Sequence, residues 1–536
     1  MPTLSLASFT RFKPADLISR ISTGARNAQG VELEANGDSD SGDISADGRH
    51  AVFISTAPNL GADPSWNIPV LLYKDLGTGA VRIVSTLPPD ATGHEQLIGD
   101  LWNPQISPDG RFVMFEAEST VLPDGIPGFD SIFVKDLRTG ALTRVDAAAP
   151  DAHGRQAPGE GFSYNASFTG DGRYVIFQSD APNLVAVNSG GKDIYRKDLQ
   201  TGAVTLVSTK ADGQVANGTS IDPAASRDGR YIVFTSTADD LVAGDTNGRA
   251  DIFRKDLVTG AVVRVSTAGR NAQGQEPEAN AKSADASISA DGRYVVFGSA
   301  ASNLVEGDTN GRIDIFRKDL LTGATVRVST GTTNGEANDD SYDAHVSPDG
   351  RYVVFVSDAS NLDGGGNGSS QVFRKDLQTG EIVRIGTTLG DRGSYDPEFS
   401  ADGRSILFNS YAANLVEGDG NRSGDVFRVD NDLLSHRQAV AEGRYVKASF
   451  DVGQASSARI SWGDGTSDTA VPAHGKVTFS HVYAVAGSKA ATVTVVDGAQ
   501  TWTVPHRIDV GALAMSRDTG LRDTLSGAAG HDVLSG

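Results

Sequence analysis

The sequence has no cysteine, so neither disulfide bonds nor thiolate metal sites are possible. It also has no apolar run long enough for a membrane span, and we expect no membrane insertion. The first twenty residues lack the apolar core of a secretory signal, which argues against export by the general secretory route.

Positive charge is scarce as well. Lys and Arg total 47 against 68 Asp and Glu, which gives a formal net charge of -21. Nucleic acids and anionic membrane surfaces require clustered positive charge, so this balance disfavours both as partners. An acidic surface is instead suited to cations.

What the chain does contain is a repeat of four short apolar segments, seen most clearly in residues 284–330. Val, Ile, Phe and Tyr alternate between Asp-Gly, Asn-Gly and Thr-Gly turns, a pattern typical of consecutive β-hairpins. An Asp-Gly-Arg signature marks each copy, at Asp47, Asp109, Asp171, Asp228, Asp291, Asp349 and Asp402. A second signature, Lys-Asp-Leu-x-Thr-Gly, begins at Lys74, Lys135, Lys197, Lys255, Lys318 and Lys375. A repeated four-stranded unit of this length predicts an all-β fold, a seven-bladed β-propeller.

The two ends of the repeat complement each other. Residues 17–23 (LISRIST) match the fourth segment of a unit, whereas the seventh unit lacks its fourth segment after Asp430. We therefore predict that the N-terminal strand completes the seventh blade and closes the ring, which would remove exposed strand edges. The tight turns would lie on one face, and the long, variable loops on the opposite face would be the candidate functional surface.

Residues 1–435 would form the propeller, and a different all-β pattern follows. Short alternating strands in 436–511 predict a small β-sandwich. The Gly- and Asp-rich tail, 512–536, has too few apolar residues for a core of its own.

Each of the three regions resembles a known family. The S-x-D-G-R-Y-V-V-F and I-F-R-K-D-L-x-T-G signatures resemble TolB-like (WD40-like) propeller repeats, which implies a binding platform as readily as an enzyme. Trp462-Gly463-Asp464-Gly465-Thr466 with His481-Val482-Tyr483 resembles a PKD domain, which implies a non-catalytic spacer or contact module. The tail resembles RTX (hemolysin-type) calcium-binding repeats, with Asp523 and Asp532 at equivalent positions. That last resemblance implies Ca²⁺ binding and type I secretion to an extracellular location.

Three loops between second and third strands support a more specific hypothesis, that they bind Ca²⁺. Each places Asp, Asn and Asp around a turn, and such oxygen ligands are suited to Ca²⁺. The candidate ligands are Asp245, Asn247, Asp251, Asp308, Asn310, Asp314, Asp419, Asn421 and Asp425. The alternative is that Asn-Gly forms a tight turn and the Asp side chains accept backbone hydrogen bonds.

The repeated Asp-Gly-Arg and Lys-Asp-Leu charges are interpreted as structural, with each Arg paired to the Asp of the second signature. The sequence has no G-x-S-x-G or H-E-x-x-H motif, and His345, beside Asp343, is the best single candidate for a central site. We therefore predict a monomeric, extracellular, non-enzymatic binding protein, associated with Ca²⁺, whose long-loop face contacts a protein or polysaccharide. The alternative is a metal-assisted polysaccharide lyase or glycosidase with a central site that includes His345, Asp343 and Asp339.

Overall fold

The computed structural model of the protein describes residues 5–510 except 12–17, 28–30, 63–68, 89–95, 124, 364–368, 386–391, 417–418, 432–433, 435–444, 452–455, 473–475, 485–486 and 498–499. The chain forms two compact units, one from Arg20 to Val429 and one from the segments before and after it. The predicted tail, with Asp523 and Asp532, lies outside the described residues.

The larger unit contains seven four-stranded antiparallel sheets, as the repeat predicts, and a two-stranded sheet of β3 (Thr23–Arg26) and β4 (Glu32–Glu34). The inner strands are β5 (Ser39–Ile44), β9 (Leu101–Ile106), β13 (Ser163–Phe168), β17 (Ser220–Ala225), β21 (Ser283–Ile288), β25 (Ser341–Val346) and β29 (Ser394–Phe399). The second strands are β6 (His50–Ser55), β10 (Phe112–Glu118), β14 (Tyr174–Ser179), β18 (Tyr231–Ser236), β22 (Tyr294–Ser299), β26 (Tyr352–Ser357) and β30 (Ser405–Ser410). The third strands are β7 (Val70–Asp75), β11 (Asp130–Asp136), β15 (Asp193–Asp198), β19 (Asp251–Asp256), β23 (Asp314–Asp319), β27 (Gln371–Asp376) and β31 (Asp425–Asp430). The short fourth strands are β8 (Val81–Ile83), β12 (Leu142–Arg144), β16 (Val204–Leu206), β20 (Val262–Arg264), β24 (Thr325–Arg327), β28 (Ile382–Arg384) and β2 (Ile18–Arg20).

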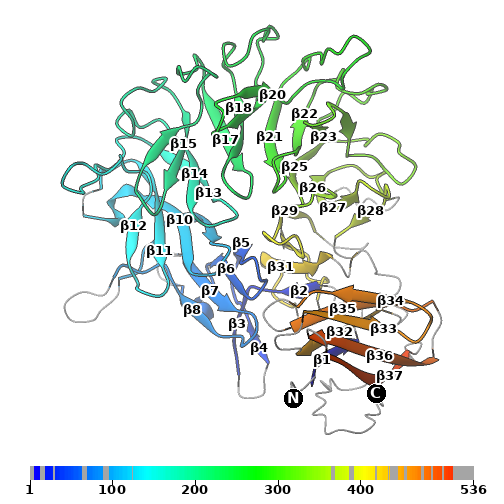
Figure 1. Ribbon diagram of the computed structural model, residues 1–536. Coiled ribbons are helices and arrows are strands. Elements are labelled where there is room, and N and C mark those ends of the chain that lie inside the picture. Colours follow the sequence, from blue (N-terminus) through cyan, green and yellow to red (C-terminus); the bar gives the residue numbers. More distant parts are fainter. Residues whose placement is uncertain are drawn as a thin grey trace. The chain divides into compact units, whose positions relative to one another are not determined.

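The seventh sheet has the order β29-β30-β31-β2, which confirms that the N-terminal strand supplies its missing member. Ser22 strengthens this pairing, because its hydroxyl donates to the carboxylate of Asp425 and accepts the N–H of Val426. The first and seventh sheets also pack together, since Ile44 and Phe53 share a hydrophobic cluster with Val426. Figure 1 shows the inner strands facing a common centre, with the fourth strands outside.

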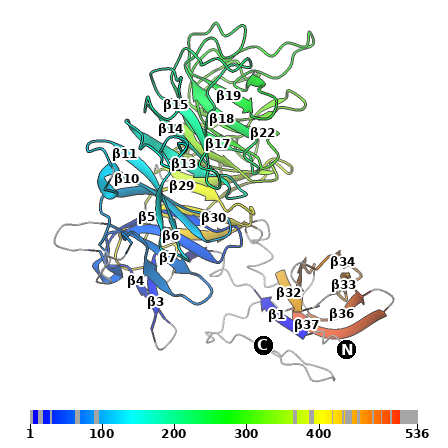
Figure 2. The same cartoon turned by 60° about the vertical axis from the view of Figure 1, so that its left-hand side comes forward.

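The hydrophobic core lies between the blades. One cluster, for example, joins Val296 and Ile315 of the fifth blade to Val353, Phe355 and Phe373 of the sixth. The sheets of the third and fourth blades, labelled β13–β15 and β17–β19 in Figure 2, follow one another in the same way. The second strands, such as Tyr352–Ser357, are buried and mostly apolar, whereas the third strands, such as Asp314–Asp319, combine apolar residues with Asp, Arg and Lys.

The two repeated signatures stabilise each blade. Arg293 donates through Nε and Nη2 to the two carboxylate oxygens of Asp319, at 2.9 and 2.7 Å. Arg111–Asp136, Arg230–Asp256 and Arg351–Asp376 make the same two-bond contact, and Arg173 makes a single bond, from Nη2 to Asp198. A two-bond Arg–carboxylate pair fixes orientation as well as charge, so the structural interpretation of these motifs is confirmed in five blades.

A second arginine links neighbouring blades. Arg317 of β23 donates to the carbonyl of Gly350 in the next Asp-Gly turn at 3.0 Å, and its guanidinium lies over the ring of Tyr294. Arg254 and Arg196 make the same contacts one and two blades earlier. The third, fourth and fifth blades are therefore each tied to the next blade by an arginine of the third strand.

The smaller unit contains two sheets, with the orders β1-β32-β35 and β34-β33-β36-β37. Their strands are β1 (Ser5–Arg11), β32 (Tyr445–Asp451), β33 (Ser457–Ser461), β34 (Ser467–Ala470), β35 (Lys476–Val482), β36 (Gly487–Asp497) and β37 (Gln500–Val510). Residues of both sheets, including Ile460, Trp462 and Phe479, form one core. The strands predicted after residue 436 are therefore present.

The boundary predicted at the N-terminus is different in the structure. Residues 1–435 were expected to belong to the propeller, but β1 pairs with β32, with Ser5 opposite Asp451 and Arg11 opposite Val446. The first strand of the chain thus belongs to the smaller unit, and the propeller is inserted between β1 and β32. No helix among the described residues is long and apolar enough to cross a membrane.

Candidate functional site

The inner strands share an unusual backbone feature at their third residue. These residues have positive φ angles, between 49° and 56°: Ser41, Asn103, Asn165, Asp222, Asp285, Asp343 and Asp396. Each lies where the pairing between the first and second strands shifts register, which marks a β-bulge. Asn and Asp tolerate the left-handed region better than other non-glycine residues, which explains the residue types at six of the seven positions; Ser41 is the exception.

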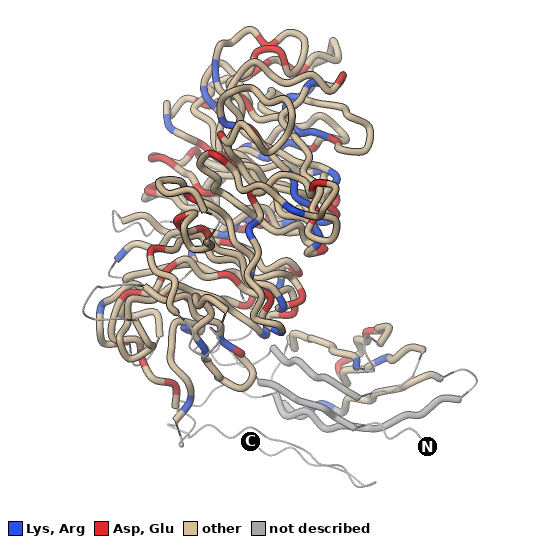
Figure 3. Tube along the Cα trace, turned by 90° about the vertical axis from the view of Figure 1, so that its left-hand side faces the viewer, with Lys and Arg blue, Asp and Glu red and all other residues tan. Residues whose placement is uncertain are grey.

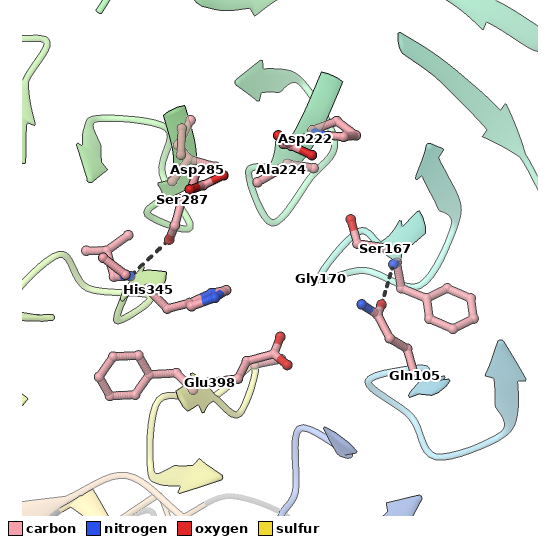
Figure 4. A pocket seen from close by; sticks show the side chains of 18 of the residues that line it. Gln105, Ser167, Gly170, Asp222, Ala224, Asp285, Ser287, His345 and Glu398 are labelled. Carbon is pink, nitrogen blue, oxygen red and sulfur yellow. Dashed lines mark hydrogen bonds between the residues drawn. The ribbon is translucent and has the colours of Figure 1, made fainter. Parts of the chain in front are cut away.

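Three levels of side chains follow from this geometry. The third residues form the mouth level, towards the long loops. The fifth residues form the middle level: Asp43, Gln105, Ser167, Ala224, Ser287, His345 and Glu398. The turn level lies just beyond the inner strands, next to the Asp-Gly turns, at the eighth position counted from the start of each strand. Its residues are Ala46, Pro108, Gly170, Arg227, Ala290, Pro348 and Ala401. Members of all three levels, from the second to the seventh blade, line a cavity of about 730 Å³ (Figure 4).

The mouth level is charged on one side only. The fourth to seventh blades contribute Asp222, Asp285, Asp343 and Asp396, whereas the first three contribute Ser41, Asn103 and Asn165. Burial and the charge of Asp285 raise the pKa of Asp222, and burial and the charge of Asp343 raise the pKa of Asp396. Amide donors offset part of this charge, from Asn165 to Asp222 at 2.8 Å and from Asn409 to Asp396 at 3.0 Å, and the positive charge of Lys282 acts on Asp222 and Asp285.

His345 is the basic group of the middle level. Its side chain is 41% exposed, and Nε2 lies 3.6 Å from Asp343 Oδ1. Burial opposes protonation, but the adjacent carboxylate of Asp343, together with the charges of Glu398 and Asp396, raises the pKa of His345. Figure 4 shows the imidazole and the Glu398 carboxyl group projecting into the same space.

Two carboxyl groups meet where the seventh blade adjoins the first. Burial raises the pKa of Glu398, and burial together with the charge of Glu398 raises the pKa of Asp43 well above its usual range. Asp43 also accepts the N–H of Ile106 at 2.8 Å, so it links the first blade to the second. Gln105 and Ser287 accept equivalent N–H groups from Phe168 and Val346. These three middle-level residues therefore have a structural role, in contrast to His345 and Glu398.

The long loops contribute less to this cavity than expected. The predicted functional surface was the long-loop face, whereas the cavity is lined by inner strands and the turns that follow them. His345 and Asp343, the predicted central candidates, both line it. Asp339, predicted with them, instead pairs with Arg312 at 3.1 Å.

The predicted calcium loops contain an arginine among their carboxylates. In the fourth blade, Arg264 Nη1 lies 3.2 Å from Asp245 and 2.7 Å from Glu278. The amide of Asn247 donates to Asp251 at 2.7 Å, and its oxygen accepts the N–H of Arg249. The side chain of Asn247 thus closes a turn, and a guanidinium provides the positive charge.

The other two loops repeat this arrangement. Arg327 lies 3.5 Å from Asp308, 3.6 Å from Asp314 and 2.6 Å from Glu336, while Asn310 donates to Asp314. Arg20 lies 3.4 Å from Asp419, 3.3 Å from Asp425 and 3.1 Å from Glu34, while Asn421 donates to the carbonyl of Ala35. These contacts favour the ion-paired turn over the calcium site. Across the described part of the chain, no group of three or more His, Cys, Asp or Glu is placed to hold a metal ion.

Sequence reasoning missed most of the cavity's acidic groups. Asp222, Asp285, Asp396 and Glu398 were not singled out, although Asx recurs two residues after the first Ser of most inner strands. That recurrence was the available signal, since Asx in a strand favours a bulge or turn. Which of those side chains share a cavity depends on how seven separate strands converge.

No protein-family model and no curated protein matches the sequence. Among solved structures, the chain is similar to TolB from Acinetobacter baumannii, with 15% identity over 68% of this chain and 76% of that one and a TM-score of 0.33. It is also similar to an oligogalacturonate lyase in complex with manganese, with 14% identity over 80% and 97% of the two chains and a TM-score of 0.44. A third is the β-propeller domain of the Trilobed protease from Pyrococcus furiosus, with 14% identity over 74% and 95% and a TM-score of 0.43. These similarities, to TolB and other β-propeller proteins, leave open whether the chain is an enzyme.

Proposed function

We propose that this protein is a binding protein whose central cavity takes an extended, positively charged segment of a partner protein. The observation that supports this most directly is the choice of Asp at four adjacent mouth positions. The bulge explains an Asx residue there, and Asn fulfils the same backbone role in the second and third blades. The backbone therefore does not account for the four negative charges.

Charge distribution supports the same proposal. Like charges that converge in a cavity repel one another, and a cation placed between them relieves that repulsion. Elsewhere on the propeller, acidic and basic residues are interspersed (Figure 3). A peptide with Lys or Arg side chains has the complementary charge, and an extended chain fits a cavity lined by parallel levels of side chains.

The second candidate is an enzyme acting on a polysaccharide, favoured by His345 and Glu398 projecting into one cavity. A His held between carboxylates has the composition of a general acid–base pair. An acidic polysaccharide is a poor fit, because Arg227 and His345 are the only basic residues that line the cavity in the described structure. Neutral polysaccharide turnover by wild type, abolished in His345→Ala, would favour the enzyme.

The binding function is tested by capture from a degenerate library of peptides of about seven residues on the immobilised full chain. Wild type should enrich peptides that contain Lys or Arg. The variant with Asp222, Asp285, Asp343 and Asp396 all changed to Asn should lose that enrichment, since Asn suits the bulge. A control of equal net charge changes four exposed residues, Glu118, Glu160, Glu306 and Glu381, to Gln and should retain it. Equal enrichment by wild type and the four-Asn variant would refute the proposal.

Calcium association and an extracellular location remain proposals that rest on the sequence. Thermal unfolding in excess EDTA and in millimolar Ca²⁺, with Mg²⁺ as control, tests the first. A calcium-specific rise in Tm, lost when Asp245, Asp308 and Asp419 become Asn, would mean that Ca²⁺ displaces the arginines, because a ligand specific for the native state stabilises it. An unchanged Tm would leave these loops as ion-paired turns. Fractionating a producing culture into medium and cells tests the second.

A further inference from the structure

We infer that the bound segment is the C-terminal end of the partner chain, inserted with its terminal carboxylate against Arg227 and a basic side chain at the mouth level. This inference rests on the proposed function and adds a direction to it. The evidence is that the cavity carries opposite charges at its two ends.

The turn level has a single charged residue. At the position of Arg227 the other blades have Ala46, Pro108, Gly170, Ala290, Pro348 and Ala401. Arg227 lines the cavity and is exposed, and its guanidinium makes no ion pair or hydrogen bond within the described structure. Neighbouring carboxylates are already engaged, since Asp171 accepts the hydroxyl of Thr169 and the N–H of Arg173. Arg227 is thus a guanidinium with its donors available.

The position of Arg227 depends on its neighbour Gly170. A Cβ atom on Gly170 would lie 2.7 Å from Arg227 Cγ and 3.1 Å from its Cα. A residue with a side chain at position 170 would therefore displace the arginine. Glycine permits the close approach, and the arginine lies over it at the end of the cavity.

The turn level is also the fixed end of the cavity. Backbone hydrogen bonds join successive blades there, from Arg227 N to the Ala290 carbonyl at 3.1 Å and from Ala290 N to the Pro348 carbonyl at 3.0 Å. The Arg227 carbonyl in turn accepts the N–H of Asp171 at 3.0 Å. These bonds hold the blades together at this level, and the leading end of a segment inserted from the mouth would meet Arg227 there.

The distance between the two charged levels sets the spacing of the ligand's charges. Five residues of an inner strand separate a mouth-level residue from the turn level, which at about 3.3 Å per residue is roughly 16 Å. An extended peptide covers that distance in about five residues. A Lys or Arg about five residues before the C-terminus would then reach the mouth-level Asp residues while the carboxylate meets the guanidinium, the acceptor that Arg binds best.

The test uses the same degenerate peptide library in two forms, with free C-terminal carboxylates and with C-terminal amides, on the full chain. Wild type should capture the free-acid form at least about tenfold better than the amide, a difference of about 1.4 kcal/mol in binding free energy. It should also enrich peptides with Lys or Arg about five residues from the C-terminus. Arg227→Ala, which reproduces the residue found in three other blades, should lose the preference for the free acid and keep the enrichment of basic residues. The four-Asn variant should lose the enrichment of peptides that contain Lys or Arg and keep the preference for a free C-terminal carboxylate.

The outcomes separate this inference from the proposed function. Equal capture of acid and amide libraries by wild type, with basic residues still enriched, would overturn the inserted C-terminus and leave the binding function intact. Basic residues enriched without a fixed distance from the C-terminus would overturn it as well. Failure to enrich basic residues in either form would refute both.

Discussion

His345 Nε2 lies 3.6 Å from Asp343 Oδ1, and this contact joins the middle level to the mouth level within β25. Asp343 has a positive φ angle at the bulge of β25, two residues before His345. The carboxylate beside the imidazole raises the pKa of His345.

The first prediction concerns the pKa of His345. Asp343→Asn removes the largest factor that favours the protonated imidazole, so the pKa of His345 should fall. A two-dimensional NMR titration of the histidine ring protons measures it, with the exposed His153 as internal reference. Because the folded-state pKa is raised, this contact contributes stability fully below about pH 6.5, and that stability is lost as the pH rises through the folded-state value. A His345 resonance that titrates identically in both proteins would contradict the assignment.

The second prediction concerns the Arg293–Asp319 pair. The two hydrogen bonds from Arg293 hold the pKa of Asp319 far below its usual range. A depressed carboxyl pKa contributes stability above about pH 4, lost as the pH falls below it. Arg293→Lys cannot make the two-bond contact, so its acid-unfolding midpoint, followed by circular dichroism, should lie at a higher pH than that of wild type. Arg404→Lys is the matched control, because Arg404 is 83% exposed and lies 3.8 Å from Asp402.

The third prediction concerns the arginine among the loop carboxylates. Arg264→Ala leaves Asp245, only 3% exposed, beside Glu278 without a compensating charge. Unfolding free energy measured in urea should fall by about 2–4 kcal/mol, because an unpaired buried charge is costly. Arg249→Ala, an exposed position on the same loop, should change stability by less than about 0.5 kcal/mol. Equal losses in the two variants would show that Arg264 is not the counter-charge.

The fourth prediction separates the two N-terminal strands. Deletion of residues 1–11 removes β1, the partner of β32, and should abolish the unfolding transition of the smaller unit while the propeller's transition remains. Ser22→Ala should act on the propeller instead, because Ser22 bonds to Asp425 and Val426 of β31. Differential scanning calorimetry of both variants makes the comparison. A deletion that leaves two transitions would mean that β1 is dispensable to its sheet.

Local signatures predicted the propeller well. Asp-Gly-Arg and Lys-Asp-Leu mark the turns and both partners of the ion pair within a blade, such as Arg293–Asp319. A single repeat is therefore enough to predict the local structure of a blade. The pairing of Ile18–Arg20 with β31 was also predictable, because the missing segment and the extra segment have the same sequence pattern. These features depend on contacts within one blade or on similarity between blades.

The features that were missed depend on distant contacts. Nothing in residues 5–11 indicates a partner near residue 446, because the sequence of a short strand does not specify which sheet it joins. The Asp-x-Asn loops predicted ligands from their spacing, but the arginine beside each comes from the fourth strand of the same blade. The mouth-level carboxylates likewise belong to four different blades, and only the assembled ring brings them together.

Insertion of the propeller between β1 and β32 has a consequence for synthesis of the chain. Ribosomes make β1 and β2 first, but their partners β32 and β31 emerge only after the other blades. At typical elongation rates that delay is on the order of tens of seconds. During that time both strands have exposed backbone groups that could pair with another nascent chain. The Asp and Arg residues in and beside these strands, such as Arg11, Asp16 and Arg20, add the charge that discourages such pairing while the chain is unfinished.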